Sequence, residues 1–256
     1  MDDNLTIYFV GTAGSGKTTL TYAFQSWMKH QGYDAITVNL DPGVERIPYP
    51  ADVDVRDWIN LNEVMDRYGL GPNGAQVMCA DMLGLKAVEI KETIEEFETD
   101  YVLIDTPGQI ELFAYRESSR TAIDILGKEN SIIAFLFDPH LSKNPLGFVS
   151  LLMLGASVQF RFSLPFVNVL SKADMLDEET IDKIISWGGD VMELQDAILK
   201  MGNGMERESA IETLRTLERL ETFKSLIPVS SETYLGMEDV YNTAQQVFMG
   251  GEDLSK

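Results

Sequence analysis

The segment GTAGSGKT, residues 11–18, constrains the fold more than any other part of this 256-residue sequence. It fits the pattern G-x-x-x-x-G-K-[ST], and it lies between an apolar run, Leu5–Val10, and a helical stretch that begins at Lys17. Glycine lets the backbone turn sharply, so that successive N–H groups can surround a phosphate chain at the N-terminus of the helix. The pattern therefore predicts a strand, a phosphate-binding loop and a helix, in that order.

Each residue at the end of this loop has a predicted role. The Lys17 ammonium would reach the β- and γ-phosphates of a nucleotide, and the Thr18 hydroxyl would ligate Mg²⁺. The nucleotide-binding residues predicted here are Gly14, Ser15, Gly16, Lys17, Thr18 and Thr19.

Short apolar runs alternate with longer helical stretches along the rest of the chain. The predicted strands are Leu5–Val10, Ala35–Leu40, Tyr101–Asp105, Ser131–Phe137, Pro165–Leu170 and Leu226–Ser230. The predicted helices are approximately Lys17–Gln31, Arg56–Tyr68, Ala75–Glu98, Ser118–Leu126, Pro145–Phe162 and Met237–Phe248. The apolar runs are continuous rather than alternating, which is typical of parallel strands buried on both faces. We therefore expect an α/β protein with the three-layer P-loop NTPase fold, a mostly parallel central sheet and helical insertions.

The segment Asp177–Glu221 contains acidic amphipathic helical patterns and no apolar run of the strand type. We expect a helical insertion at about residues 177–222 with a solvated acidic face, inside a single domain over residues 1–256. The chain then ends in a short polar tail, Gly250–Lys256.

Charge and cysteine content exclude several classes of protein. The chain has 20 Lys and Arg against 41 Asp and Glu, a formal net charge of −21, and no cluster of basic residues. Such a chain is repelled by nucleic-acid phosphates and anionic lipids, so we expect no direct nucleic-acid or membrane binding. Cys79 is the only cysteine, which excludes an internal disulfide. The acidic N-terminus does not resemble a secretory signal, and the apolar stretch Leu146–Val158 is too short to cross a bilayer, so we expect a cytoplasmic protein.

Two further acidic positions follow predicted strands. In DTPGQIE, Asp105 can hold Mg²⁺ through water, and the Gly108 N–H can lie near a γ-phosphate. Asp41 ends the strand Ala35–Leu40, where its carboxylate can orient an attacking water or contribute to the metal site. Its alternative role is to cap the turn formed with Pro42 and Gly43.

The segment SKAD, residues 171–174, follows another predicted strand at the place where N-K-x-D reads guanine. Asp174 would accept hydrogen bonds from guanine N1–H and N2–H₂, which adenine lacks, so its carboxylate can select GTP over ATP. Lys172 would place its methylene stem on the base, and Ser171 stands where the pattern has Asn. Ser230 and Ser231 follow the last predicted strand, where a backbone N–H would meet guanine O6.

Gly71–Gly74, GPNG, lies between two predicted helices and by itself reads as a turn. Taken together with NLDPG, DTPGQIE and the phosphate loop, however, it makes the whole chain resemble the GPN-loop GTPases. These are P-loop NTPases of the dimeric SIMIBI class, and Gly71-Pro72-Asn73 matches their signature.

The resemblance implies an archaeal-type homodimer that binds GTP or GDP with Mg²⁺ and hydrolyses GTP. In this family the GPN loop of one protomer points at the nucleotide of the other, so Asn73 would act in trans near the γ-phosphate. The implied catalytic residues are Asp41, Asn73, Gln109 and Glu111, and the implied metal-site residues are Thr18, Asp41 and Asp105. Eukaryotic relatives are linked to assembly of RNA polymerase, which suggests a protein client for a GTP-dependent switch.

Three other functions stay open at this level. ATPases of the same class carry an extra lysine in the phosphate loop at the place of Thr12. The absence of this lysine, together with the presence of Asp174, disfavours an ATPase. P-loop kinases need an acceptor pocket and a lid with clustered arginines, whereas Arg207, Arg215 and Arg219 alternate with glutamates. An assembly factor could use hydrolysis only as a timer, and this function is compatible with the GTPase prediction.

Overall fold

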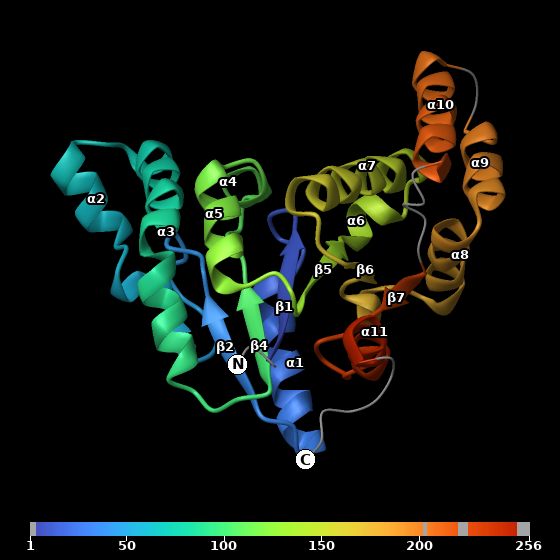
Figure 1. Cartoon of the computed structure of the whole chain (residues 1–256). Coiled ribbons are helices and arrows are strands. Elements are labelled where there is room, and N and C mark those ends of the chain that lie inside the picture. The colour runs from blue at the N-terminus through green and yellow to red at the C-terminus, as the bar shows by residue number, and fades with distance from the viewer. Residues whose placement is uncertain (1–3, 202–203, 220–224, 250–256) are drawn as a thin grey trace.

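The computed structural model describes residues 4–201, 204–219 and 225–249. Within them, seven parallel strands form one sheet in the order β3-β2-β4-β1-β5-β6-β7 (Figure 1). The strands are β1 (Leu5–Gly11), β2 (Ala35–Asn39), β3 (Val53–Asp54), β4 (Tyr101–Asp105), β5 (Ser131–Phe137), β6 (Phe166–Leu170) and β7 (Leu226–Pro228). The predicted α/β fold with a central parallel sheet is confirmed.

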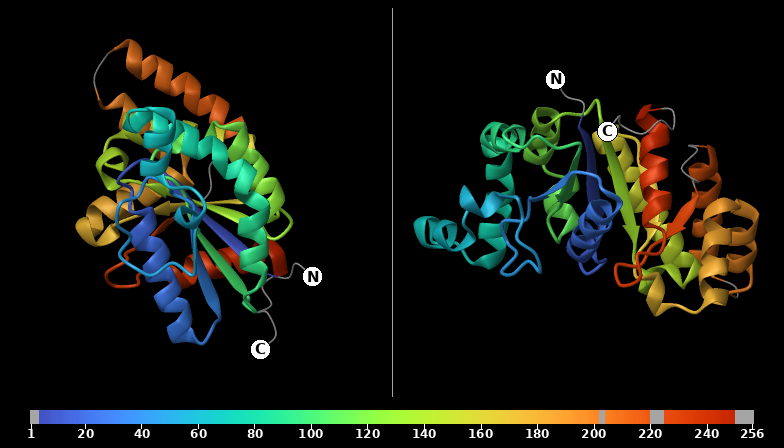
Figure 2. Two further views of the ribbon diagram at one scale, coloured as in Figure 1. Left: turned by 90° about the vertical axis from the view of Figure 1, so that its left-hand side faces the viewer. Right: turned by 90° about the horizontal axis from the view of Figure 1, so that it is seen from below.

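Helices cover both faces of this sheet, which gives three layers (Figure 2). The helices are α1 (Lys17–Gln31), α2 (Leu61–Tyr68), α3 (Pro72–Glu95), α4 (Ile110–Ala114), α5 (Glu117–Leu126), α6 (Pro139–Ser142), α7 (Pro145–Phe162), α8 (Glu178–Gly189), α9 (Val191–Leu199), α10 (Met205–Arg219) and α11 (Met237–Met249), with 3₁₀ turns η1 (Val55–Asp57) and η2 (Ala173–Met175). Helices α1 and α11 share one hydrophobic cluster with the sheet, and α2, α3, α5, α7 and the helices of the insertion share the other.

The strand β1 shows why the sheet is buried on both faces. Its side chains alternate between the two clusters, with Ile7 and Phe9 in the cluster of α1 and Tyr8 and Val10 in the cluster of α3 and α7. All four are at most 1% exposed. A continuous apolar run is therefore the pattern that this position requires.

The strand order brings the carboxyl ends of β2, β4, β1, β5 and β6 side by side. In the register of the sheet, Asp105 at the end of β4 pairs with Phe9 of β1 and with Asn39 of β2. Loops that are distant in the sequence therefore meet at this edge, which is where open α/β sheets bind their ligands.

Several predicted boundaries are wrong, each for a local reason. The expected helix Arg56–Tyr68 is a 3₁₀ turn followed by α2, because the Asn60 side chain accepts hydrogen bonds from the N–H groups of residues 62 and 63 and starts a new helix. The expected helix Ala75–Glu98 runs from Pro72 to Glu95. The two-residue edge strand β3 and the short helices α4 and α6 carry too little periodicity to be predicted.

The GPNG segment is not a free turn between helices. Gly71 is the N-cap of α3, and Pro72 and Asn73 are the first residues of that helix. Proline suits this position because its missing N–H would be unpaired in the first turn anyway. Asn73 is therefore fixed to a helix of 24 residues.

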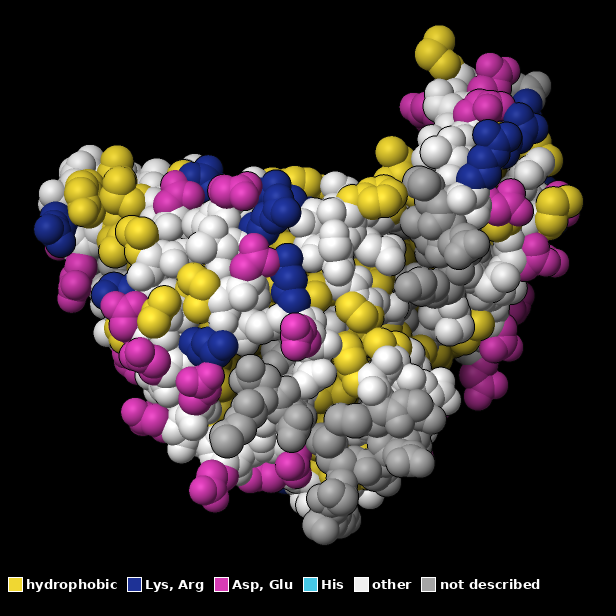
Figure 3. Space-filling view, viewed as in Figure 1, with side chains coloured by type: hydrophobic (Ala, Val, Ile, Leu, Met, Phe, Trp, Pro, Cys, Tyr) yellow, Lys and Arg dark blue, Asp and Glu magenta, His cyan; other side chains and the backbone are white. Residues whose placement is uncertain are grey.

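The predicted insertion contains three helices, α8, α9 and α10, and α10 projects away from the sheet (Figures 1 and 3). On the face shown in Figure 3, hydrophobic side chains emerge over α2 and at the tip of α10. Met205 at the start of α10 is 84% exposed. Residues 220–222 of the predicted insertion and the tail Gly250–Lys256 lie outside the described residues.

Among the described residues, one helix, α7, is long and apolar enough to cross a membrane by length and composition. It has 18 residues and extends beyond the apolar stretch Leu146–Val158, so length alone does not exclude a membrane span. Helix α7 packs against β5 and α10, and eight of its residues are buried. This packing is that of a core helix, a kind of helix that meets the same criteria of length and composition.

Candidate functional site

The loop between β1 and α1 has the geometry that the glycine pattern predicts. Gly14 and Gly16 adopt φ of +77° and +95°, a region that residues with a side chain rarely enter, and Gly16 is the N-cap of α1. Within the loop the Ser15 N–H donates to the Thr12 carbonyl at 3.2 Å. The buried Ser15 hydroxyl has no hydrogen-bond partner among the described residues. This geometry is the one that anion-binding loops at helix N-termini have.

Lys17 is folded back over this loop. Its Nζ donates to the carbonyls of Gly11 and Thr12, both at 3.0 Å, and to the Gly108 carbonyl at 3.1 Å. Burial lowers the pKa of Lys17, although Asp105 and Asp41 oppose that shift. The ammonium thus links the phosphate loop to the loop after β4, and only neutral carbonyls accept its hydrogen bonds.

Asp105 and Thr18 offer the kind of oxygen groups that Mg²⁺ prefers. The Asp105 side chain is buried, its Oδ1 has no hydrogen-bond partner among the described residues, and burial raises its pKa to about 7. A hydrogen bond from Thr18 lowers that pKa without offsetting burial. A divalent cation would compensate the buried charge. Since no described group of three His, Cys, Asp or Glu could hold a metal, the other ligands would be phosphate oxygens and water, as Mg²⁺ prefers.

Asp41 joins the loop after β2 to the loop after β4. Its Oδ1 accepts a hydrogen bond from the Gly43 N–H at 2.9 Å, and its Oδ2 accepts one from the Gly108 N–H at 2.8 Å. Both the turn-capping role and a link to the predicted phosphate sensor are therefore present. A γ-phosphate that bound the Gly108 N–H would have to replace this carboxylate.

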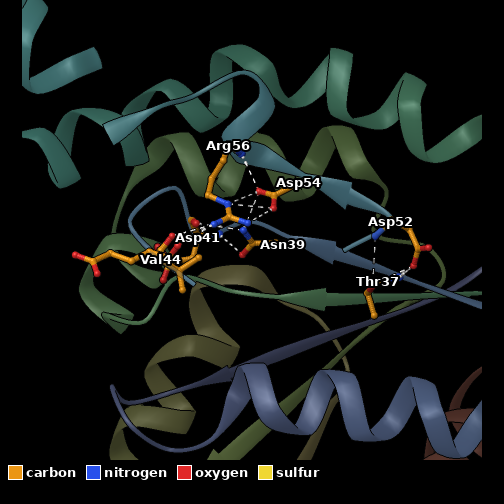
Figure 4. A network of polar contacts seen from close by, with 8 residues as sticks. Thr37, Asn39, Asp41, Val44, Asp52, Asp54 and Arg56 are labelled. Carbon is orange, nitrogen blue, oxygen red and sulfur yellow. Dashed lines mark hydrogen bonds and ion pairs between the residues drawn. The ribbon is translucent and has the colours of Figure 1, made fainter. Parts of the chain in front are cut away.

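A polar network holds the Asp41 loop in place (Figure 4). The Asn39 side chain accepts from the Asp41 N–H at 3.0 Å and donates to Asp54 Oδ1, also at 3.0 Å. Arg56 donates through Nε to both Asp54 oxygens, and its NH1 donates to the Val44 carbonyl at 3.2 Å. Although burial opposes ionisation, hydrogen bonds from Arg56 and Asn39 hold the pKa of Asp54 below its ordinary value.

The predicted base-reading residues line a cavity of about 170 Å³. Ser171, Lys172, Asp174 and Ser231 come from the loops after β6 and β7. Gly16 and Thr19, which were predicted for the phosphate loop, line the cavity from the start of α1. Lys172 Nζ donates to the Gly14 carbonyl and to Asp138 Oδ2. Ser230 does not line this cavity, because its hydroxyl accepts from the N–H groups of Glu232 and Thr233 and shapes the turn that presents Ser231.

The predicted catalytic residues are only partly brought together. Asp41, Gly108 and Gln109 line a cavity of about 80 Å³, and Gln76 of α3 lines it as well. Glu111 is exposed in the first turn of α4. Asn73 is exposed at the start of α3 and does not line this cavity.

Four residues of the site were not predicted: Gln76, Asp54, Arg56 and Asp138. Asp138 had a recognisable signal, because it directly follows the buried strand β5 just as Asp105 ends β4. Asp54 ends β3 and Arg56 follows it, and this two-residue strand is too short to be recognised, so the sequence offered no comparable signal for them.

Comparisons with known proteins agree with this geometry. A family model described as "Conserved hypothetical ATP binding protein" matches residues 9–250. A GPN-loop GTPase of Pyrococcus abyssi is 33% identical over 251 residues, covering 97% of this chain and 99% of that protein. The apo crystal structure of a GTPase from the same organism superposes with a TM-score of 0.85 at 32% identity, covering 96% of this chain and 98% of that one.

A eukaryotic relative is longer than this chain. GPN-loop GTPase 1 of Schizosaccharomyces pombe is 32% identical over 245 residues, which cover 91% of this chain and 66% of the yeast protein. The chain thus spans about two thirds of that relative and nearly all of the Pyrococcus protein.

Proposed function

The chain belongs to the GPN-loop GTPase family, and on this premise we propose that it binds GTP with Mg²⁺ and hydrolyses the bond between the β- and γ-phosphates as a homodimeric switch. The observation that carries the proposal is the continuous site at the carboxyl edge of the sheet. The phosphate loop connects the buried Asp105 at one end with the cavity that contains Asp174 at the other.

At the phosphate end, the chain's own residues account for binding and for sensing of the γ-phosphate. The N–H groups of the loop and Lys17 would bind the phosphates, and Thr18 with Asp105 would hold Mg²⁺, which neutralises charge on the β- and γ-oxygens. The cavity beside Asp41 and Gln109 offers space for the attacking water. Displacement of Asp41 from Gly108 would report that GTP has bound.

At the base end, Asp174 decides between guanine and adenine. The family model's description mentions ATP, whereas an exposed carboxylate in the cavity matches the paired donors of guanine. We expect GDP to bind at least about 100-fold more tightly than ADP, because adenine would leave this acceptor unpaired.

Calorimetry with GDP, ADP and xanthosine diphosphate tests this choice. Asp174→Asn should shift the preference from guanosine to xanthosine diphosphate, because the amide can donate to the additional xanthine oxygen. Equal affinity of the unmodified protein for GDP and ADP would overturn the guanine proposal, and the ATPase alternative would replace it.

The homodimer is supported by the surface of α3. Val77, Leu85 and Val88 are 38%, 78% and 52% exposed, and their spacing places them on one face of this helix. The exposed Asp81, which pairs with Arg116, lies between Val77 and Leu85 and interrupts this apolar stripe. Asn73 is one turn before Val77 and shares that face. A second copy that covered the apolar stripe would therefore bring Asn73 to the interface, as a trans-acting residue requires.

A kinase is less well supported. In the insertion, Arg215 pairs with Glu212 of the same helix, so this arginine serves a surface ion pair rather than a phosphate-binding lid. We propose instead that the switch acts on a protein client in complex assembly, with RNA polymerase or its assembly factors suggested by the family. Capture experiments comparing GTP-locked and GDP-bound protein test for a nucleotide-dependent client.

A further inference from the structure

The guanine-reading loop has Ser171 in place of the Asn of the usual N-K-x-D pattern, and this serine hydrogen-bonds to the central sheet. The Ser171 side chain is buried, and its hydroxyl donates to the Phe137 carbonyl at the end of β5, at 3.2 Å. Ser171 N–H donates to the same carbonyl at 3.1 Å. Ser171 therefore attaches the loop to the sheet, and its hydroxyl proton is not directed to the phosphate loop.

The connection to the phosphate loop is made by Lys172. Its Nζ donates to the Gly14 carbonyl, and its stem lies so close to Gly16 that a Cβ there would be 3.4 Å from Lys172 Cε. Lys172 has φ of 52°, a left-handed conformation that residues with a side chain rarely adopt. The contacts of its ammonium hold the loop together with backbone hydrogen bonds, which run from the Ala173 N–H to the Val229 carbonyl and from the Met175 N–H to the Lys172 carbonyl, both at 3.0 Å.

The second acceptor of that ammonium is Asp138, which directly follows β5. Asp138 Oδ2 lies 3.0 Å from Lys172 Nζ, and Oδ1 accepts from the His140 N–H at 2.8 Å, which caps α6. The Asp138 side chain is 12% exposed, so its charge is largely removed from water. The hydrogen bond from the His140 N–H to Oδ1 orients the Asp138 carboxylate, so that Oδ2 can accept the hydrogen bond from Lys172.

We propose that Asp138 is a specificity-positioning residue for guanine. Through Lys172 it fixes the base-reading loop to the phosphate loop, a connection that the Ser171 hydroxyl does not make. In this way it positions Asp174, two residues after Lys172, for hydrogen bonding to the base. The inference rests on the proposed GTPase function. Asp138 acts through Lys172 and does not itself touch the nucleotide.

Asp138→Asn separates this role from helix capping, because Asn is as good an N-cap as Asp but has no charge for Lys172. We expect the variant's affinity for GDP to fall about tenfold and its affinity for ADP to change less than twofold. The matched control is Asp177→Asn, which alters the N-cap of α8, where Asp177 Oδ1 accepts from the Thr180 N–H, and lies outside the nucleotide-binding residues. It should leave both affinities unchanged.

A double-mutant cycle with Lys172→Met tests the route of the effect. Once the ammonium is absent, Asp138→Asn should produce no further loss of GDP affinity, whereas independent effects would add and overturn the proposal. Unchanged GDP affinity of the single Asp138→Asn variant would overturn it as well. If the unmodified protein shows no preference for GDP over ADP, the proposed GTPase function fails first, so the two failures are distinguishable.

Discussion

At the scale of single residues, the unusual feature of the site is an acidic side chain buried before its counter-charge is bound. Asp105 is 1% exposed, and burial raises its pKa to about 7, while Lys17 and Asp41 act on it in opposite directions. A charged carboxylate that is buried in this way destabilises the folded protein, and a bound cation offsets that destabilisation. If Asp105 holds Mg²⁺ as proposed, its burial favours the cation-bound state and disfavours the nucleotide-free fold.

Asp105→Asn should therefore stabilise the nucleotide-free protein while abolishing Mg²⁺-dependent hydrolysis. The folded-state pKa is about 7 and the ordinary value is 3.8, so the folded state holds the proton more tightly between these values. The stability of the unmodified protein should fall as pH rises from about 4 to about 7 and stay low above that. The variant's advantage should thus be largest at pH 8 and shrink towards pH 4.

Thermal unfolding at a series of pH values, without nucleotide or metal, measures this difference. The control is Asp66→Asn, an exposed position in α2, which should not change the dependence on pH. An Asp105→Asn variant no more stable than the unmodified protein at pH 8 would contradict the explanation by burial.

At the scale of elements, a network of side-chain hydrogen bonds joins the parts of the connection from β2 to α2. The network of Asn39, Asp54 and Arg56 holds the loop that carries Asp41, and Arg56 lies in η1, which leads into α2 and then to Asn73 on α3 (Figure 4). Asp41 can orient a water or contact Gly108 reproducibly only if this loop is fixed. The bidentate arginine supplies that rigidity.

Arg56→Lys should slow GTP hydrolysis about tenfold and leave GDP affinity unchanged, because Lys keeps the charge but cannot form the fork to Asp54. Steady-state kinetics and GDP titration measure the two effects. The control is Asp52→Asn in the same connection. Asp52 Oδ2 accepts hydrogen bonds from the side chains of Gln25 and Thr37 and none from the loop that carries Asp41. If both variants slow turnover equally, the effect is a general loosening of the connection.

At the scale of the whole molecule, the predicted catalytic residue Asn73 does not line the cavity beside Asp41. Asn73 is exposed on a face of α3 that carries an apolar stripe, whereas the cavity beside Asp41 is lined from α3 by Gln76 instead. If a second copy covers the stripe, its Asn73 can approach the γ-phosphate of the first. Residues of two chains would then complete each site.

Asn73→Ala should lower GTP turnover by roughly 10- to 1,000-fold while nucleotide affinity and the dimer persist, because one preorganised contact of the transition state is lost. Mixing this variant with Lys17→Ala protomers tests the arrangement in trans. Heterodimers would contain one site with an intact phosphate loop and an intact opposing Asn73, so activity should return. If subunits exchange and no activity returns, Asn73 does not act across the interface.

The sequence alone determined the features that depend on local chemistry. The glycines and Lys17 predicted the phosphate loop, and the continuous apolar runs predicted six of the seven strands, because both patterns are complete within a few residues. The polar residues at the ends of these strands could be assigned to one edge, since parallel strands bring their carboxyl ends together.

Only the tertiary structure decided which of these residues touch. Asp41 meets Gly108 across 67 positions of the sequence, and Lys172 meets Asp138 across 34. Such pairs depend on the strand order, in which β4 lies between β2 and β1, and on side-chain geometry that no local pattern encodes. The start of α3 at Pro72 was missed for a related reason. GPNG fits both a turn and a helix N-terminus, and packing of Ala75 and Cys79 into the core selects the helix.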